Sequence, residues 1–196
     1  LDMRMSGDGP TAADFVNEAG EEEIADVIYH YGEERYSRRI ARGIVEARAI
    51  DPILSTAQLV GIIHKNVRRS KDGIDPATRT FMALRIQVND ELGELERGLI
   101  GAEKILAPGG RLVVVSFHSL EDRRVKSFLH ERSGATGRGS RHMPELPADA
   151  PIPSFKLIKR GAIKPSETEA SENPRARSAR LRVAERSDAP AWSNRQ

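Results

Sequence analysis

The chain has 196 residues, of which 38% are hydrophobic and 31% are charged, so its composition is that of a globular domain and not of a collagen-like or disordered chain. It contains no cysteine, which excludes disulfide scaffolds, cysteine-ligated zinc, iron–sulfur clusters and thiol nucleophiles, and it agrees with a reducing cytoplasm. No apolar run approaches the roughly 18 residues that a membrane span needs, and no secretory signal segment opens the chain.

The charge is unevenly distributed. Residues 1–50 carry eleven Asp or Glu against six Lys or Arg, whereas residues 111–186 carry sixteen Lys or Arg against nine Asp or Glu. A basic second half is typical of proteins that bind polyanions such as RNA. The alternative is that these cations only solvate a sheet edge and a loop, and charge alone leaves the two interpretations balanced.

The first hundred residues predict helices. Thr11 is the expected N-cap of the first helix, and Asp14 completes a capping box with it. From Pro76 onward, apolar residues three or four positions apart predict one long helix that ends at a Pro-Gly-Gly turn. The expected helices span residues 12–19, 21–30, 33–49, a segment capped by Ser55 or Thr56, and 76–106.

The pattern changes at residues 111–117, a continuous apolar run rich in β-branched residues, which predicts a strand buried on both faces. A helix over 120–131, a loop over 132–154 and two strands at 155–158 and 179–184 are expected to follow. Neither a single buried strand nor two trailing strands are stable alone, so the sheet is expected to have further members outside this sequence.

Polar residues follow the expected buried strand, at the start of the next helix. Ligands bind outside the carboxyl ends of strands in open α/β sheets, and His118 can donate or accept a proton near neutral pH. The structural alternative is that Ser119 caps the helix and the acidic residues after it favour the helix dipole. The five histidines have no metal-ligand spacing, so no metal site is expected.

An arginine-rich segment, 173–182, precedes and enters the last strand. Arg177 falls in the expected turn, where an arginine is suited to phosphate contacts. Arg180 and Arg182 are expected on one strand face, with the apolar residues that alternate with them facing the core. The alternative is an edge strand that its charges protect from aggregation.

Several short motifs occur in a fixed order along the chain, namely 1–5 (LDMRM), 9–14 (GPTAAD), 31–35 with 38–41 (YGEER, RRIA), 79–86 (RTFMALRI), 88–92 (VNDEL), 108–112 (PGGRL), 116–123 (SFHSLEDR) and 173–182 (NPRARSARLR). Together they closely resemble the ribosomal RNA small subunit methyltransferase H family, and the resemblance covers residues 1–186. The family transfers a methyl group from S-adenosylmethionine to the exocyclic N4 amine of a cytidine in the decoding region of 16S rRNA. The resemblance therefore implies a cytoplasmic enzyme whose partner is the small ribosomal subunit.

The resemblance implies an α/β fold, in which an all-helical subdomain is inserted into a Rossmann-like methyltransferase sheet that is partial here, its N-terminal strands being absent. The family's glycine-rich loop and main cofactor contacts lie upstream of the segment that begins at Leu1. No residue here inherits those contacts, and the chain is expected to be the substrate-side portion of the enzyme. The implied parts are 1–10, the pocket-lining end of the core; 11–75, the insertion; 76–186, the rest of the core; and 187–196, a disordered tail.

The chemistry of the implied reaction suggests roles for individual residues, as hypotheses. Asp2 is expected to accept a hydrogen bond from the cytidine amine, and Arg4 to orient Asp2. His118 is the second catalytic candidate, and it is expected to line the pocket of the flipped base with Ser116 and Ser119. The expected phosphate contacts are Arg138, Arg141, Arg177 and Arg180.

Two other functions stay open at this point. A non-catalytic RNA-binding or ribosome-assembly module needs no cofactor and suits a chain that lacks the glycine-rich loop. A methyltransferase that acts on proteins or small molecules is disfavoured by the basic second half. No membrane or metal partner is expected, and the sequence leaves a homodimer open.

Overall fold

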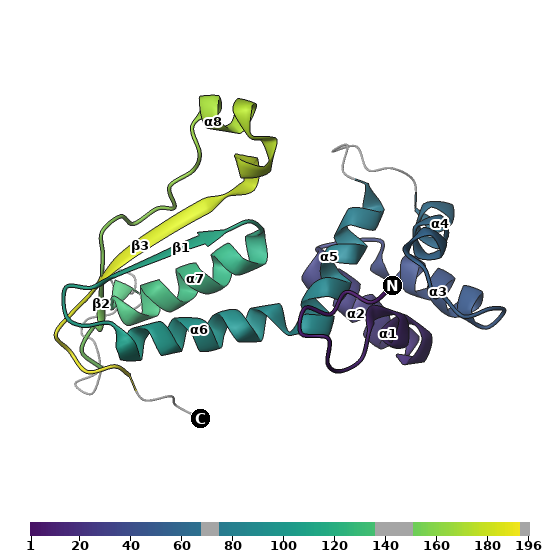
Figure 1. Ribbon diagram of the computed structural model, residues 1–196, viewed down its shortest axis with the longest axis horizontal. Helices are drawn as coiled ribbons and strands as arrows, with labels where there is room; N and C mark the ends of the chain where they lie inside the picture. Colours follow the sequence, from purple (N-terminus) through teal and green to yellow (C-terminus); the bar gives the residue numbers. More distant parts are fainter. Residues whose placement is uncertain (68–74, 136–150, 193–196) are drawn as a thin grey trace, which may run out of the picture. The chain divides into compact units, whose positions relative to one another are not determined.

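The computed structural model describes residues 1–67, 75–135 and 151–192 and divides into two compact units, Leu1–Glu91 and Leu92–Gln196 (Figure 1). The first unit is helical and the second combines helices with a small sheet. None of the described helices is long and apolar enough to cross a membrane.

The first unit is a bundle of helices around an aliphatic core. Its elements are α1 (Ala12–Glu18), α2 (Glu21–Gly32), α3 (Ser37–Arg48), α4 (Thr56–Asn66) and α5 (Pro76–Asn89). The largest core side chains are isoleucines and leucines, namely Ile24, Ile28, Ile40, Ile44, Ile53, Ile63, Leu59 and Leu84. Helices therefore bury one apolar stripe each, as the spacing of these residues predicts.

Two of the helix starts are fixed by capping boxes. The Thr11 hydroxyl accepts a hydrogen bond from the Asp14 backbone N–H, and the Asp14 carboxylate accepts one from the Thr11 N–H at 2.8 Å. Ser55 and Gln58 make the same reciprocal pair at the start of α4. The caps predicted from Thr11 and Ser55 are thus confirmed.

The single helix expected over 76–106 is wrong, because the chain forms α5 and then a separate helix, α6 (Glu91–Ile105). Asp90 lies between them with φ 45°, in the left-handed region that ends α5. The Asn89 side chain holds this end, since it donates to the Met3 carbonyl and accepts from the Met5 N–H, both at 2.8 Å. Apolar spacing continues through one such residue, so periodicity does not reveal the break. The first compact unit runs from Leu1 to Glu91, and the boundary at residue 75 expected for the insertion stays a prediction.

Gly32, the last residue of α2, lies where α2 packs tightly on α5. A Cβ at this position would come within 2.8 Å of the Arg79 backbone carbonyl oxygen. We expect Gly32→Ala to lower the free energy of unfolding by about 1–3 kcal/mol, because α2 and α5 must move apart. Gly61→Ala, on α4 with open space around it, is the control, and it should stabilise by about 0.5–1 kcal/mol. Chemical denaturation measures the free energy of unfolding of both variants. Equal changes in the two would contradict the close approach of Gly32 to the Arg79 carbonyl.

The second unit builds a three-stranded antiparallel sheet in the order β1-β3-β2. Its elements after α6 are β1 (Arg111–Ser116), α7 (Ser119–Arg132), β2 (Phe155–Leu157), α8 (Glu167–Glu172), a 3-10 helix (Pro174–Ser178) and β3 (Arg180–Arg186). One face of the sheet packs on α6 and α7 through a core that includes Leu99, Val125, Leu129, Phe155 and Ala184.

The expectation that the strand at 111–117 is buried on both faces is wrong for the described residues. Exposure alternates along β1, and Val113 and Val115 are 53% and 49% exposed. They lie directly opposite Val183 and Leu181 of β3, so this face of the sheet is apolar and uncovered. Continuous apolar sequence does not show how many layers cover a strand.

The faces predicted for β3 are reversed. Arg182 lies opposite Val114, which packs into the core beneath α7. The Arg182 guanidinium makes a bidentate ion pair with Asp122 of α7, with Nε and Nη2 at 2.7 Å and 2.9 Å from the carboxylate oxygens. Because this pairing satisfies the charge, Arg182 can occupy the covered face.

A buried polar network joins α6, α7 and the end of β3. Glu103 is 0% exposed, and its carboxylate accepts hydrogen bonds from Arg132 Nε at 3.1 Å and from the Ser154 hydroxyl. Arg186 donates to the Glu103 and Ser154 carbonyls, both at 2.9 Å. Every strong donor in this network therefore has an acceptor, as burial requires.

The tail after Ser187, expected to be disordered, is ordered as far as Trp192. The Trp192 backbone N–H donates to the Glu103 carboxylate at 3.2 Å, and its indole N–H donates to the Ile152 carbonyl at 2.8 Å. The Arg132 guanidinium lies 4.4 Å from the Trp192 ring centroid. Residues 193–196 lie outside the described part of the chain.

Candidate functional site

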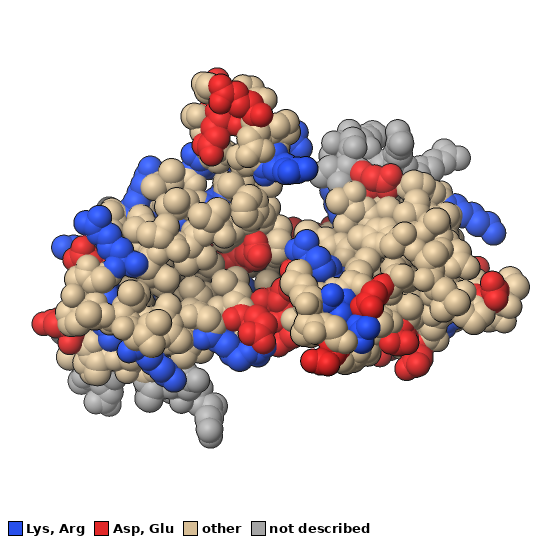
Figure 2. All heavy atoms as spheres, viewed as in Figure 1, with Lys and Arg blue, Asp and Glu red and all other residues tan. Residues whose placement is uncertain are grey.

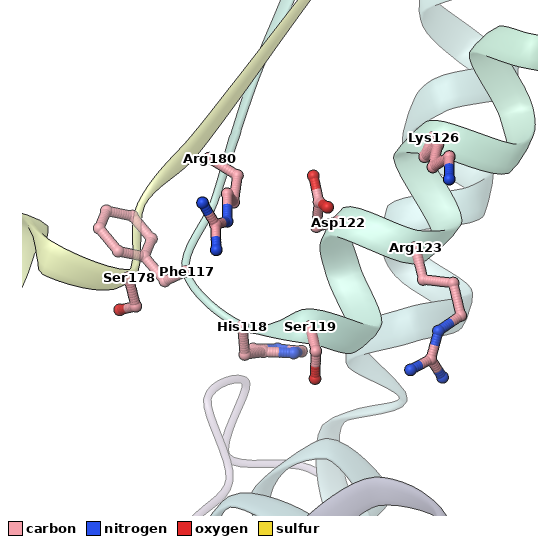
Figure 3. A pocket seen from close by; sticks show the side chains of 8 residues that line it. All are labelled: Phe117, His118, Ser119, Asp122, Arg123, Lys126, Ser178 and Arg180. Carbon is pink, nitrogen blue, oxygen red and sulfur yellow. The ribbon is translucent and has the colours of Figure 1, made fainter. Parts of the chain in front are cut away.

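A pocket of about 370 Å³ opens in the second unit where β1 ends, α7 begins and β3 begins (Figure 3). It is lined by Phe117, His118, Ser119, Asp122, Arg123, Lys126, Ser178 and Arg180. Phe117 and Ser178 lie on one side in Figure 3, the α7 side chains lie on the other, and Arg180 projects between them. Three cationic side chains, one aromatic ring and two hydroxyls thus share one small space.

His118, and not Ser119, is the N-cap of α7. Its backbone is extended, with φ −138° and ψ 165°, and its Nδ1 accepts a hydrogen bond from the Glu121 N–H at 3.4 Å. The Glu121 carboxylate in turn accepts from the Phe117 N–H at 2.9 Å. This pair of contacts fixes the turn, and Ser119, the first residue of α7, lines the pocket.

The other ring nitrogen of His118 is a buried polar atom without a hydrogen-bond partner among the described residues. The nearest carboxylate oxygen, Glu121 Oε1, is 3.5 Å away, which is an ion-pair distance and exceeds a normal hydrogen bond. Since Nδ1 accepts, Nε2 carries the proton in the neutral ring and is a donor. A buried donor of this kind is typical of a position that a ligand satisfies.

Among the described residues, Asp122 is the one carboxylate that lines the pocket, and Arg182 neutralises it from the covered face of the sheet. The hydrogen bonds from Arg182 are the main cause that lowers the pKa of Asp122 below its ordinary value, and the charges of Arg180 and Lys126 lower it further. The pocket therefore has a positive electrostatic balance, which favours an anionic ligand.

The pairing predicts how Asp122 titrates. Its carboxyl should titrate below its ordinary value of 3.8 in the wild type, and Arg182→Ala should raise the midpoint. Because the folded-state pKa is lowered, the stability that the pair contributes is present above pH 3.8 and is lost as the pH falls through the folded-state pKa. NMR titration of the side-chain carboxyls checks both. An Asp122 midpoint that Arg182→Ala leaves unchanged would contradict the pairing, and Asp14, whose pKa Thr11 lowers, is the internal control.

The structure brings together only some of the predicted site residues of this unit. His118, Ser119 and Arg180 line the pocket. Ser116 is buried on the covered face of β1, and Arg177 is exposed on the 3-10 helix; neither lines the pocket. In Figure 2, basic side chains cover the segment between α8 and β3, beside the acidic tip of α8. Arg138 and Arg141 lie outside the described residues.

Helix α7 contributes to the pocket beyond its first turn, which was not expected from the sequence. Ser119, Asp122, Arg123 and Lys126 line the pocket at positions i, i+3, i+4 and i+7, so they form one stripe of the helix. This polar periodicity was visible in the sequence and could have found them. Phe117 had no such signal, because an apolar residue at a strand end is usually core.

Asp2 and Arg4 belong to the first unit, where they form a bidentate pair. Arg4 Nε and Nη2 lie 2.7 Å and 2.9 Å from the Asp2 carboxylate oxygens, and Arg4 Nη1 donates to the Gly9 carbonyl at 3.1 Å. The hydrogen bonds from Arg4 lower the pKa of Asp2 to about 2. Asp2 is therefore an ionised, oriented hydrogen-bond acceptor at neutral pH and a weak base.

The sequence profile of the MraW methylase family matches residues 1–187. The chain belongs to this family. It is 62% identical over 192 residues to the ribosomal RNA small subunit methyltransferase H of Paramagnetospirillum magneticum and 57% identical over 196 residues to that of Rhodospirillum rubrum. Each match covers 98% of this chain and 60% of the relative, so the chain spans about 60% of the length of these two relatives.

The Rhodospirillum centenum protein of the same name is 64% identical over 191 residues, which cover 97% of this chain and 58% of that protein. The family resemblance inferred from the ordered motifs is thus confirmed. Methylases of this kind in general use S-adenosylmethionine as the methyl donor.

The pocket at α7 does not fit S-adenosylmethionine. The donor carries a sulfonium cation, whereas Arg123, Lys126 and Arg180 line the pocket and its one carboxylate is already paired. Like charges this close disfavour binding. The described residues also contain no group of three side chains that could hold a metal ion.

Proposed function

We propose that this chain is the substrate-side portion of an S-adenosylmethionine-dependent rRNA methyltransferase of the cytoplasm. The proposed acceptor is the exocyclic N4 amine of a cytidine in the decoding region of 16S rRNA in the small ribosomal subunit. The observation that carries the proposal is the family match over residues 1–187. The positively charged pocket at α7 supports an RNA substrate.

The proposed role of Asp2 is to hold the amine. A cytosine amine is a poor nucleophile because its lone pair is delocalised into the ring, so the enzyme must orient it. The Asp2 carboxylate, fixed by Arg4, accepts one of its N–H groups. With a pKa of about 2, Asp2 positions the amine and does not retain the proton that the amine loses.

The proposed role of His118 is to bind the flipped base through Nε2–H, the donor that has no hydrogen-bond partner in the described chain. Ser119 lies beside it in the pocket and offers a hydroxyl to the same ligand. Arg180 contacts phosphate, and Arg177, Arg138 and Arg141 contact the RNA outside the pocket. Ser116 supports the strand from the covered face.

The proposed fold is a Rossmann-like sheet with a helical insertion that starts after residue 10. Val113 and Val115 leave one sheet face apolar and exposed, which is the pattern of a face that further structure covers. The relatives are longer than this chain, and we propose that the additional part supplies further strands of this sheet and the cofactor site. The insertion then extends to the end of α5, since α5 belongs to the helical unit.

A methyl-transfer assay tests the substrate class. The full-length protein is incubated with labelled S-adenosylmethionine and with small or large ribosomal subunits from cells that lack the gene. We expect label in the RNA of the small subunit only. Label in protein, or in the large subunit, would contradict the proposed acceptor.

A non-catalytic RNA-binding module is the second candidate, because the pocket carries cations and does not fit the methyl donor. It predicts binding to the small subunit without methyl transfer. The same assay, combined with a subunit-binding measurement, separates the two candidates.

A further inference from the structure

We propose that the pocket at α7 binds one nucleotide of single-stranded RNA, with the base stacked on Phe117 and the phosphate held by Lys126 and Arg180. This inference deepens the proposed function, on which the identity of the nucleic acid rests. It adds to the proposed role of His118, because it names the groups that hold the ring face and the phosphate of the nucleotide in the same pocket.

Two cationic side chains from different elements line the pocket. Arg180 from β3 and Lys126 from α7 both line the pocket. Neither side chain makes a hydrogen bond or ion pair with another side chain in the described ranges 1–67, 75–135 and 151–192. The one carboxylate between them, Asp122, is already paired with Arg182. Two cations from different elements therefore face a small space whose one described carboxylate already pairs with a third cation, so a positive charge remains for a phosphate.

Phe117 adds an aromatic ring to the lining of the pocket. It is 56% exposed, although phenylalanine favours burial. Its backbone N–H is fixed by the Glu121 carboxylate at 2.9 Å, so its position at the pocket rim is set by the capping contact. An exposed aromatic ring beside cations is the arrangement on which unpaired bases stack.

The remaining lining groups fit the polar edge of the base and the ribose. Ser119, Ser178 and His118 Nε2–H add hydrogen-bond donors from three positions. The volume of about 370 Å³ is at the small end of ligand pockets and is suited to a single nucleotide. The ligand must be unpaired, because bases inside a duplex offer no free face for stacking.

Fluorescence anisotropy with a labelled short single-stranded RNA tests the proposal on the full-length protein. We expect Lys126→Ala and Arg180→Ala each to weaken binding about tenfold and to reduce the salt-dependence slope by about one. Phe117→Ala should weaken binding about tenfold and leave the salt slope unchanged, whereas Phe117→Tyr, which keeps a ring, should bind like the wild type.

Arg111→Ala is the matched control. It removes the same charge from the opposite end of the sheet, since Arg111 lies opposite Glu185 and Ser116 lies opposite Arg180. It should change affinity less than about twofold. If Arg180→Ala and Lys126→Ala bind like Arg111→Ala, or if Phe117→Tyr binds as weakly as Phe117→Ala, the pocket assignment is overturned.

Binding and methyl transfer are measured separately, so the two proposals fail separately. Pocket-dependent RNA binding without any methyl transfer by the wild type would overturn the proposed reaction and support the nucleotide pocket. Normal methyl transfer with RNA binding that no pocket variant weakens would overturn the nucleotide pocket alone. A wild type that binds no single-stranded RNA overturns it as well.

Discussion

Replacing Glu103 by alanine is expected to lower the free energy of unfolding by about 3–5 kcal/mol, because it removes the buried carboxylate that pairs with Arg132 and leaves this guanidinium only the exposed Glu131 as a partner. Glu103 is fully buried, and its carboxylate accepts from Arg132, Ser154 and the Trp192 backbone. The tail up to Trp192 should detach at the same time. Chemical denaturation measures the stability, and Trp192 fluorescence, the signal of the only tryptophan in the chain, reports the tail.

Glu94→Ala is the control for this prediction. Glu94 lies on the same helix and pairs with Arg97 at 2.8 Å, but it is exposed. Its removal should cost no more than about 0.5 kcal/mol. Equal losses of unfolding free energy in the two variants would show that the buried network around Glu103 adds no more stability than an exposed carboxylate.

Asp2→Ala is expected to lower the rate of methyl transfer in the full-length enzyme by about 100- to 1,000-fold, because the amine loses the acceptor that orients it. RNA affinity should change little, since phosphate contacts dominate it. Single-turnover assays with saturating RNA measure the rate. Asp8→Ala removes a carboxylate from the same segment and is the control; equal rates for the two variants would contradict the role of Asp2.

The low pKa of Asp2 also predicts its pH behaviour. At a pKa of about 2 the carboxylate stays ionised throughout the neutral range, so the rate should show no inflection from Asp2 there. Arg4→Ala should raise the pKa of Asp2, because the Arg4 hydrogen bonds are the main cause of its depression. An inflection near neutral pH that Asp2→Ala removes would show instead that Asp2 is the proton acceptor.

Local interactions explain which parts of the fold could be predicted from sequence. The Thr11–Asp14 and Ser55–Gln58 caps each join residues three apart; the first forms as expected, and the second selects Ser55 from the two expected cap residues, Ser55 and Thr56. The apolar stripes of the first unit depend only on helical spacing and also agree with the structure. Family membership followed from the order of such short motifs.

Long-range contacts explain what could not be predicted. Arg182 lies on the covered face of β3, opposite to the expectation, because its guanidinium pairs with the carboxylate of Asp122, 60 residues away. Asp90 ends α5 while Asn89 bonds to Met3 and Met5, more than 80 residues earlier. Trp192 is ordered through Glu103, 89 residues away. No local pattern encodes these partners, and the same holds for the pocket, which joins α7 to β3.

Nucleoside mass spectrometry tests the central claim most directly. The full-length protein and S-adenosylmethionine are added to small ribosomal subunits from cells that lack the gene, and the digested RNA is searched for N4-methylated cytidine. We expect this nucleoside to appear with the wild type and to fall with Asp2→Ala. Methylation of another base or another atom, or none with the methyl donor bound, would contradict the account.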